Sequence, residues 1–297
     1  MRTTLRSGSL LSPALLIATL LAGCATAPPL EPPPPVPPPA SPAPESPIPA
    51  ASAAPSGAPA AKAAVVDHVE VSPAIRAIVD ATDRTDADKA LDAGRKPAEM
   101  LSFFGIKSGM KVAELGAGGG YTAELLARAV GPSGKVYAQN SKFILERFAE
   151  KPWSERLARP VMKNVVRVDR DFDDPLPPEA KDLDAVFVVL FYHDTVWLDV
   201  HRDAMNQAIL RSLKPGGILA LIDHSGRDGT GVTEVKTLHR IEQKAVLDEL
   251  LRAGFRLESE ATFLRNPADT RDWNDSPTAA GDKRGTSDRF VLKLLKP

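Results

Sequence analysis

Residues 111–130, KVAELGAGGGYTAELLARAV, decide the fold of this chain. Lys111–Leu115 is an apolar run of strand length, and Thr122–Val130 has the apolar spacing of an amphipathic helix. Between them lies a cluster of glycines, which can adopt positive φ and let a backbone approach a ligand that a Cβ would obstruct. A strand, a glycine turn and a helix in this order predict a ligand-binding turn within an α/β fold.

Strands and helices alternate along the rest of the domain. Further strands are predicted at Lys135–Gln139, Val165–Val168, Ala185–Leu190, Ile218–Ile222, Phe255–Phe263 and Arg289–Leu295. Helices are also predicted at Pro73–Thr82, Pro97–Phe104, Phe143–Ala149, Thr195–Leu213 and Ile241–Ala253. This alternation predicts a mostly parallel, seven-stranded sheet with helices on both faces. Ligands of such sheets bind beyond the carboxyl ends of the strands.

The N-terminal residues have the pattern of an export signal. Arg2 and Arg6 precede a mostly apolar run at Leu10–Leu21, which is too short for a permanent membrane span. Leu21–Cys24 resembles a bacterial lipobox, so residues 1–23 are predicted to be a lipoprotein signal peptide and Cys24 to be lipidated. An ordinary signal peptide with an incidental cysteine is the alternative. Ala25 follows the cysteine where an aspartate would otherwise retain such a lipoprotein, so we predict that the protein is anchored to the outer membrane on its periplasmic side.

A proline-rich segment follows the predicted anchor. Of the 28 prolines in the chain, 15 fall between Ala25 and Ala64, a stretch without aromatic residues. Such a composition cannot bury enough apolar surface to offset the entropy of ordering it. Residues 24–64 are therefore predicted to be the lipidated cysteine and a disordered linker, with a proline-recognition ligand as the alternative. Residues 65–297 are predicted to form one α/β domain.

Charge and cysteine content exclude several classes of function. The formal net charge is −1, whereas nucleic-acid binders usually carry a basic surplus, so no nucleic-acid partner is predicted. Cys24 is the single cysteine, which excludes an intramolecular disulfide and a cysteine-rich zinc site. We predict a monomer and no metal site.

The glycine turn fits a dinucleotide fingerprint poorly. Counted from Gly116, the last position of the pattern is Tyr121, which is neither glycine nor alanine. Counted from Gly118, the pattern fits Gly120 and Ala123 but starts two residues late after the strand. An acidic residue about 20 positions further on is absent in either register. These departures disfavour an NAD(P)-dependent oxidoreductase.

The same residues resemble the class I S-adenosylmethionine-dependent methyltransferases. Their first motif is an acidic residue at the strand end followed by three alternate glycines, which Glu114, Gly116, Gly118 and Gly120 match. Further matches follow in order at Arg170-Asp171-Phe172, Asp184-Ala185-Val186 and Leu213-Lys214-Pro215-Gly216-Gly217. The resemblance spans about residues 90–297 and implies a Rossmann-like methyltransferase fold whose last strand runs antiparallel.

The resemblance also implies a cofactor, S-adenosyl-L-methionine, and residues that hold it. Glu114 would lie near the methionine end, and the glycine loop with Ala117 would pass beneath the sugar. Asp171 would accept a hydrogen bond from the adenine amino group, and Phe172 would flank the ring; a solvated loop acid is the alternative for Asp171. Asn140 stands where an acidic residue usually grips the ribose, which is a departure from the pattern.

Candidate catalytic residues follow the fourth and fifth predicted strands. A neutral nucleophile needs a base, and histidine has a suitable pKa, so His193 is predicted to be the general base or to orient the acceptor. Asp194 could orient His193 or cap the following helix. His224 is the next candidate. Arg95 could meet the cofactor carboxylate, with a solvated arginine as the alternative.

Two loops are predicted to form the acceptor pocket, Ser225–Val232 and Arg265–Ser287. The second exceeds ordinary loop lengths and is predicted to be a lid or a disordered segment, with Trp273 stacking on a substrate or pinning the loop. We interpret the chain as an exported methyltransferase that acts on a small molecule or a cell-envelope component. A catalytically inactive binding module that keeps the fold is the main alternative.

Overall fold

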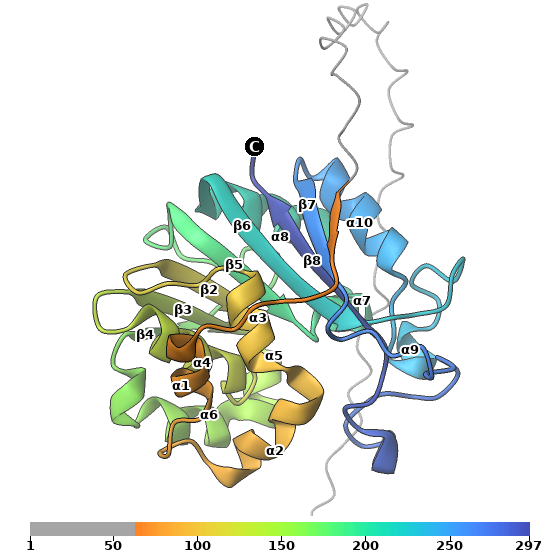
Figure 1. Ribbon diagram of the computed structural model, residues 1–297. Coiled ribbons are helices and arrows are strands. Elements are labelled where there is room, and N and C mark those ends of the chain that lie inside the picture. The colour runs from red at the N-terminus through yellow and green to blue at the C-terminus, as the bar shows by residue number, and fades with distance from the viewer. Residues whose placement is uncertain (1–62) are drawn as a thin grey trace, which may run out of the picture. The chain divides into compact units, whose positions relative to one another are not determined.

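The computed structural model describes residues 63–297, which form an eight-stranded sheet with helices around it (Figure 1). The spatial order of the strands is β1-β7-β8-β6-β5-β2-β3-β4. Their bounds are β1 (Ala64–Val66), β2 (Lys111–Leu115), β3 (Lys135–Asn140), β4 (Val165–Asp169), β5 (Leu183–Val189), β6 (Leu213–His224), β7 (Arg256–Ala261) and β8 (Arg289–Leu295).

The sheet is parallel except for its last strand. β8 pairs antiparallel with both β6 and β7, whereas the other neighbours run parallel. This inserted antiparallel strand confirms the predicted topology. The predicted number of seven strands is wrong by one, because β1 adds to the edge with Ala64 opposite Ser259. This strand has only three residues and follows directly on the proline-rich segment, so its pattern carries no strand signal.

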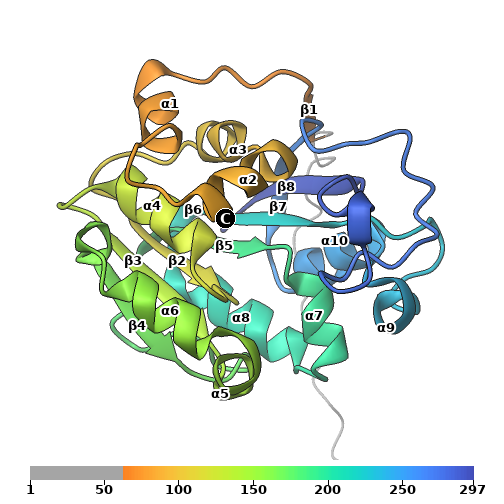
Figure 2. The ribbon, with the colours of Figure 1, turned by 90° about the horizontal axis from the view of Figure 1, so that it is seen from below.

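Helices cover both faces of the sheet (Figure 2). Their bounds are α1 (Pro73–Val79), α2 (Asp86–Arg95), α3 (Pro97–Phe103), α4 (Tyr121–Val130), α5 (Lys142–Ile144), α6 (Glu150–Leu157), α7 (Tyr192–Trp197), α8 (Arg202–Ser212), α9 (Val235–Leu238) and α10 (Gln243–Arg252). Successive strand residues point to opposite faces. Val112 and Phe187 accordingly belong to the core under α3 and α4, and Ala113 and Val186 to the core under α8 and α10.

Several helix predictions need correction. The helix predicted at Phe143–Ala149 continues through a π-helical turn to the end of α6, and α9 was not predicted. The predicted helix Thr195–Leu213 is divided into α7 and α8, and Asp199 between them has φ +53°. Helix α2 was not predicted, because its residues are mostly charged or small and Leu91 is its one large apolar residue. Its N-cap, Thr85, accepts a hydrogen bond from the Asp88 N–H, which shows why the helix starts there.

Residues 1–62 lie outside the described part of the chain. The signal peptide, Cys24 and nearly all of the linker fall there, so these predictions stay predictions. Within residues 63–297, no helix is long and apolar enough to cross a membrane.

Candidate active site

The glycine loop between β2 and α4 uses its three alternate glycines in two different ways. All three have positive φ: +66° at Gly116, +55° at Gly118 and +83° at Gly120. A Cβ at Gly116 would lie 2.4 Å from the Phe191 ring, and one at Gly120 would lie 2.4 Å from the Trp153 ring. At Gly118, no atom of residues 63–297 would come within 4 Å, so this position alone leaves space for a ligand.

Two of the three residues predicted to hold ribose and adenine pack against the protein itself, and the third is exposed. The Asn140 amide is fully buried and pairs with the Gly118 backbone, accepting from its N–H at 2.8 Å and donating to its carbonyl at 3.1 Å. Phe172 is buried with its ring 4.7 Å from that of Phe191, and Asp171 is exposed. Asn140 therefore fixes the shape of the glycine loop.

Glu114 is a buried acid with unused hydrogen-bonding capacity. Its side chain is 3 % exposed, and its Oε2 atom has no hydrogen-bond partner within the described residues. Burial raises the pKa of Glu114 to about 7, although the Thr122 hydroxyl and the charge of Arg95 act in the opposite direction. A buried polar atom without a partner is costly, so this carboxylate is suited to a cationic ligand group.

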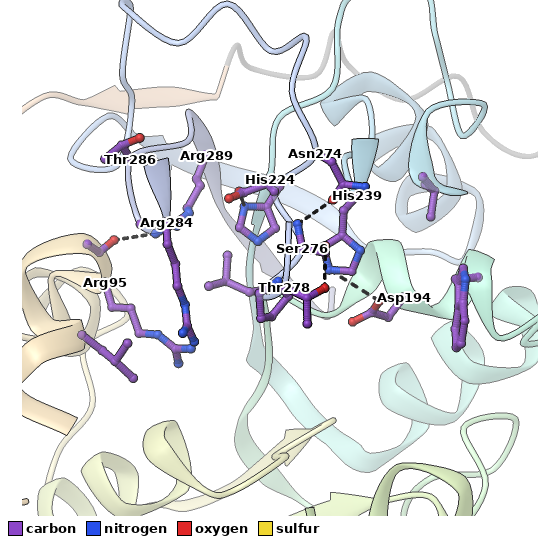
Figure 3. Close-up of a pocket in the computed structure, with 18 of the residues that line it drawn as sticks. Arg95, Asp194, His224, His239, Asn274, Ser276, Thr278, Arg284, Thr286 and Arg289 are labelled. Carbon is purple, nitrogen blue, oxygen red and sulfur yellow. Dashed lines mark hydrogen bonds and ion pairs between the residues drawn. The ribbon is translucent and has the colours of Figure 1, made fainter. Parts of the chain in front are cut away.

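A cavity of about 1080 Å³ opens beyond the carboxyl ends of β5 and β6 (Figure 3). Three predicted residues line it: Arg95, Asp194 and His224. A narrow crevice shares Arg95 with the cavity and reaches Tyr121 and Thr122 at the start of α4. The glycine loop lies behind Phe191 and contributes nothing to the cavity wall within the described residues.

One end of the cavity is cationic. Arg95 and Arg284 point into it from α2 and from the loop before β8 (Figure 3), and neither has an ion-pair partner within residues 63–297. The Arg95 guanidinium lies 4.5 Å from the Tyr121 ring centroid. Burial lowers the pKa of Arg95, and it lowers that of the neighbouring Arg289 to about 10. This end of the cavity is suited to an anionic group.

The other end holds three histidine rings. His193, His224 and His239 have ring centroids 4.1–6.2 Å apart. His224 and His239 line the cavity, whereas His193 is fully buried behind its wall. His193 Nδ1 lies 2.6 Å from Asp223 Oδ1, and the His193 N–H donates to Asp223 Oδ2 at 2.7 Å. Asp223, at the end of β6, therefore orients His193.

Two predictions about Asp194 are corrected by this geometry. Helix α7 begins at Tyr192, so Asp194 lies in its first turn and is not the N-cap. Its carboxylate is 3.4 Å from His193 Nε2 and 3.9 Å from His239 Nε2. Asp194 thus lies between two histidines, and the orienting role that it was predicted to have belongs to Asp223.

The predicted general base is positively charged at neutral pH in this arrangement. Burial opposes the imidazolium of His193, but the charges of Asp223 and Asp194 outweigh it and raise the pKa of His193 to about 9. A protonated imidazole cannot accept a proton, and full burial keeps His193 from direct contact with a ligand in the cavity. The prediction that His193 is the base is therefore not supported.

Sequence reasoning missed His239, Asp223 and Asp275. His239 ends α9 at φ +58°, an uncommon backbone conformation that turns its ring into the cavity. An Asp275 carboxylate oxygen lies against His224 Nδ1. Burial lowers the pKa of His224 to about 4, because Asp275 only partly offsets it. Of these three residues, only Asp223 could have been suggested by the sequence, because it directly precedes the candidate His224 at a strand end.

The long loop before β8 is an ordered wall of the cavity. Asp269 accepts hydrogen bonds from Arg240 Nη1 at 2.8 Å, Trp273 Nε1 at 2.7 Å and the Asp288 N–H at 2.6 Å. Residues 274–278 and 284–286 of this loop line the cavity. The Trp273 ring lies against Arg240, 4.5 Å from its guanidinium, so it pins the loop. The predicted wall Ser225–Val232 is wrong; α9 takes that place within the described residues.

Comparisons with known proteins agree with this fold. The family model described as protein-L-isoaspartate(D-aspartate) O-methyltransferase matches residues 56–169. A protein-L-isoaspartate O-methyltransferase of Ignicoccus hospitalis is 29% identical over 137 residues, which are 46% of this chain and 57% of that protein. The ubiquinone/menaquinone biosynthesis C-methyltransferase UbiE of Pseudomonas putida is 30% identical over 125 residues, 42% of this chain and 46% of that protein.

The chain thus spans about half the length of the curated relatives it matches. Among solved structures, a SAM-dependent methyltransferase from Aquifex aeolicus superposes with a TM-score of 0.50 at 22% identity, covering 72% of this chain and 100% of that chain. The strand order with its inserted antiparallel β8, the glycine loop and these matches together establish that the chain has the fold of the class I S-adenosylmethionine-dependent methyltransferases.

Proposed function

We propose that the protein transfers a methyl group from S-adenosylmethionine to an acceptor in the cavity beyond β5 and β6. The observation that carries this proposal is the cavity itself, whose volume of about 1080 Å³ lies at the site where this fold binds ligands. Ligand pockets usually have about 300–1,000 Å³, so the space is sufficient for the cofactor and a small acceptor together.

S-adenosylmethionine is the methyl donor, and the residues present fit it. Its amino and sulfonium groups are cationic, which suits the unpartnered Oε2 of Glu114. Its carboxylate suits Arg95, which faces the cavity without an ion-pair partner in the described chain. The open space at Gly118 allows the backbone to approach the ligand. The bound cofactor supplies an electrophilic methyl group.

The protein's contribution is to position the reactants. Methyl transfer from a sulfonium is an in-line displacement, in which holding both partners in line provides most of the rate enhancement. Arg95 would hold the cofactor at one end of the cavity, and Glu114, which is buried outside the cavity wall near Arg95, would act through its charge. His224, His239 and Asp194 would then contact the acceptor at the other end.

Equilibrium binding tests the cofactor assignment. Calorimetry should show binding of S-adenosylmethionine and none of NAD⁺. Arg95→Gln removes the guanidinium that meets the carboxylate and should weaken S-adenosylmethionine binding by about 10–100-fold, the value of a charge-assisted pair. Lys96→Gln, at the exposed neighbouring residue, is the matched control and should bind like the wild type. Equal binding by both variants would remove Arg95 from the site.

The acceptor is a small molecule or a component of the cell envelope, and the protein acts on it as an exported, lipid-anchored monomer. Export and anchoring are supported by the sequence pattern of Arg2, the apolar run Leu10–Leu21 and Cys24. Cys24→Ser should release the protein from the membrane fraction, and unchanged fractionation would contradict the anchor. Radiolabel from methyl-labelled cofactor should appear in envelope extracts incubated with the protein; binding without transfer would instead favour the inactive binding module.

A further inference from the structure

Two histidines and one aspartate, His193, His239 and Asp194, lie close together at the wall of the cavity. His193 and Asp194 come from α7, and His239 comes from the end of α9. Asp194 Oδ1 lies 3.4 Å from His193 Nε2 and 3.9 Å from His239 Nε2, and the three ligand atoms lie within 4.8 Å of one another. Ligands of a tetrahedral metal with bond lengths near 2.1 Å are separated by about 3.4 Å, so this spacing is close to that of a metal site.

The buried nitrogen of His193 points at this position without a partner. His193 is 0 % exposed, and its Nε2 atom makes no hydrogen bond within the described residues. Its other nitrogen, Nδ1, is held 2.6 Å from Asp223 Oδ1. A carboxylate behind one ring nitrogen fixes the tautomer that presents the other nitrogen's lone pair to a metal ion. The cluster therefore contains the supporting carboxylate that metal-binding histidines usually have.

The electrostatics of the cluster also call for a cation. Asp194 and Asp223 face His193 from α7 and β6, and Asp275 approaches from the loop before β8. His239 meanwhile occupies the left-handed C-cap position of α9.

We propose that His193, Asp194 and His239 bind one divalent first-row transition-metal ion at the wall of the cavity. Two imidazoles and one carboxylate suit zinc, iron or cobalt, whereas magnesium and calcium prefer oxygen ligands. Asp223 acts as a positioning residue. Three protein ligands leave a coordination position open, and Asp194 and His239 line the cavity, so that position faces the space for the acceptor.

This inference adds to the proposed function. Its consequence for the acceptor holds only if the protein is a methyltransferase. An oxygen or nitrogen of the acceptor would occupy the open position beside the metal ion. A metal ion stabilises the deprotonated form of such a group. The acceptor class is therefore one with a hydroxyl or another ionisable donor. Its proton would pass to water in the cavity as the group binds the metal ion, so no free histidine base is needed.

Metal binding is measured on the purified full chain, stripped with EDTA and free of S-adenosylmethionine. Zn²⁺ titration by calorimetry should give one site per chain, and Co²⁺ should produce visible absorption bands of a coordinated ion. His239→Ala and Asp194→Asn should each weaken Zn²⁺ binding by at least about 100-fold, and Asp223→Asn by about 10–100-fold. His201→Ala, at an exposed histidine of the same domain, should bind like the wild type.

The inference is overturned if the wild type binds no Zn²⁺ below millimolar concentration, or if His239→Ala and Asp194→Asn bind as the wild type does. Thermal melting of each variant shows whether it is folded, and His239→Ala, at a partly exposed side chain, keeps the test valid if Asp223→Asn does not fold. Because the titration contains no cofactor, loss of Zn²⁺ binding is distinguishable from failure to bind S-adenosylmethionine, which is measured separately.

Discussion

The site lies along the carboxyl ends of the strands, and the two halves of this edge of the sheet are stabilised differently. On one side, β2, β3 and the glycine loop pack on apolar rings: Phe191 covers Gly116, and Trp153 covers Gly120. On the other side, β6, α9 and the loop before β8 are held by buried charges, with Asp269 as the centre of one network and Asp223 of another. We call these the glycine half and the charged half.

The family model ends at residue 169, the last residue of β4, so its match lies wholly before the charged half. The glycine half is thus the part that the family model matches, and it is suited to a common cofactor. The charged half carries the histidines and the cavity wall, and it is therefore the part that would distinguish one acceptor from another.

The largest effect is expected in the charged half, at Asp269. Arg240 is fully buried and pairs with Asp269 Oδ2 at 2.8 Å. Asp269→Ala leaves that guanidinium buried without its partner, so the free energy of unfolding should fall by about 3–5 kcal/mol. Asp272→Ala, at an exposed acid of the same loop, should cost less than about 0.5 kcal/mol. Urea unfolding measures both; similar losses would mean that the network does not hold the loop.

The glycine half offers a matched pair of substitutions. Gly116→Ala adds a methyl group against the Phe191 ring at positive φ and should cost about 2–4 kcal/mol of unfolding free energy. Gly118→Ala has the same backbone strain but open space, so it should cost about 1 kcal/mol.

The same pair separates stability from binding. The methyl group of Gly118→Ala takes space that the cofactor needs, and S-adenosylmethionine affinity should fall by about 10–100-fold in calorimetry. If Gly118→Ala binds as well as the wild type, the open space is not the cofactor site, and the glycine half is structural only.

The sequence predicts the glycine half better than the charged half, for a physical reason. The strand Lys111–Leu115, the glycine turn and α4 follow one another along the chain, so one local pattern indicates all three elements. Glu114 was accordingly predicted, whereas the antiparallel β8 was expected from the resemblance to the methyltransferases. Asn140 was placed at the right strand end, but its bond to the Gly118 backbone, 22 residues away, has no signature in the sequence.

The charged half depends on contacts between distant residues. His193 meets Asp223 across 30 residues, and Asp269 meets Arg240 across 29. Single histidines and aspartates are common in loops, so no spacing indicates which of them meet. His239 reaches the cluster only because the helix that ends there turns into the left-handed region. Such residues can be identified only from the structure.

A third prediction concerns pH and Glu114. The pKa of Glu114 is about 7 in the folded protein against 4.5 for the free side chain, mainly because of burial. Between these values the folded state binds more protons than the unfolded state, so the contribution of Glu114 to stability is lost as pH rises from about 4.5 to 7. The loss reaches about 3–4 kcal/mol, since each pKa unit corresponds to about 1.4 kcal/mol.

Glu114→Gln isolates this effect because it removes the charge and keeps the shape. Arg95 and Arg156 also face Glu114, and both stay charged throughout this range. The stability of the variant relative to the wild type should therefore increase between pH 5 and pH 8 in urea unfolding. In the wild type, S-adenosylmethionine should bind more tightly at pH 8 than at pH 6. A pH-independent difference between the two proteins would show that Glu114 does not titrate there.

The smallest effect on stability is expected where the two halves meet at the cavity mouth. Trp197 lines the cavity and is 46 % exposed, with its ring centroid 6.1 Å from that of Phe143. Trp197→Phe should change the free energy of unfolding by less than about 0.5 kcal/mol.

The indole of Trp197 is nevertheless placed to report on ligands, because a molecule in the cavity replaces water at its face. S-adenosylmethionine should shift the emission of the wild type to shorter wavelength, and Trp197→Phe should keep the affinity but lose the shift. A shift that persists in the variant would come from Trp153 or Trp273, and would show that the ligand acts on the buried core or on the long loop instead of entering at this mouth.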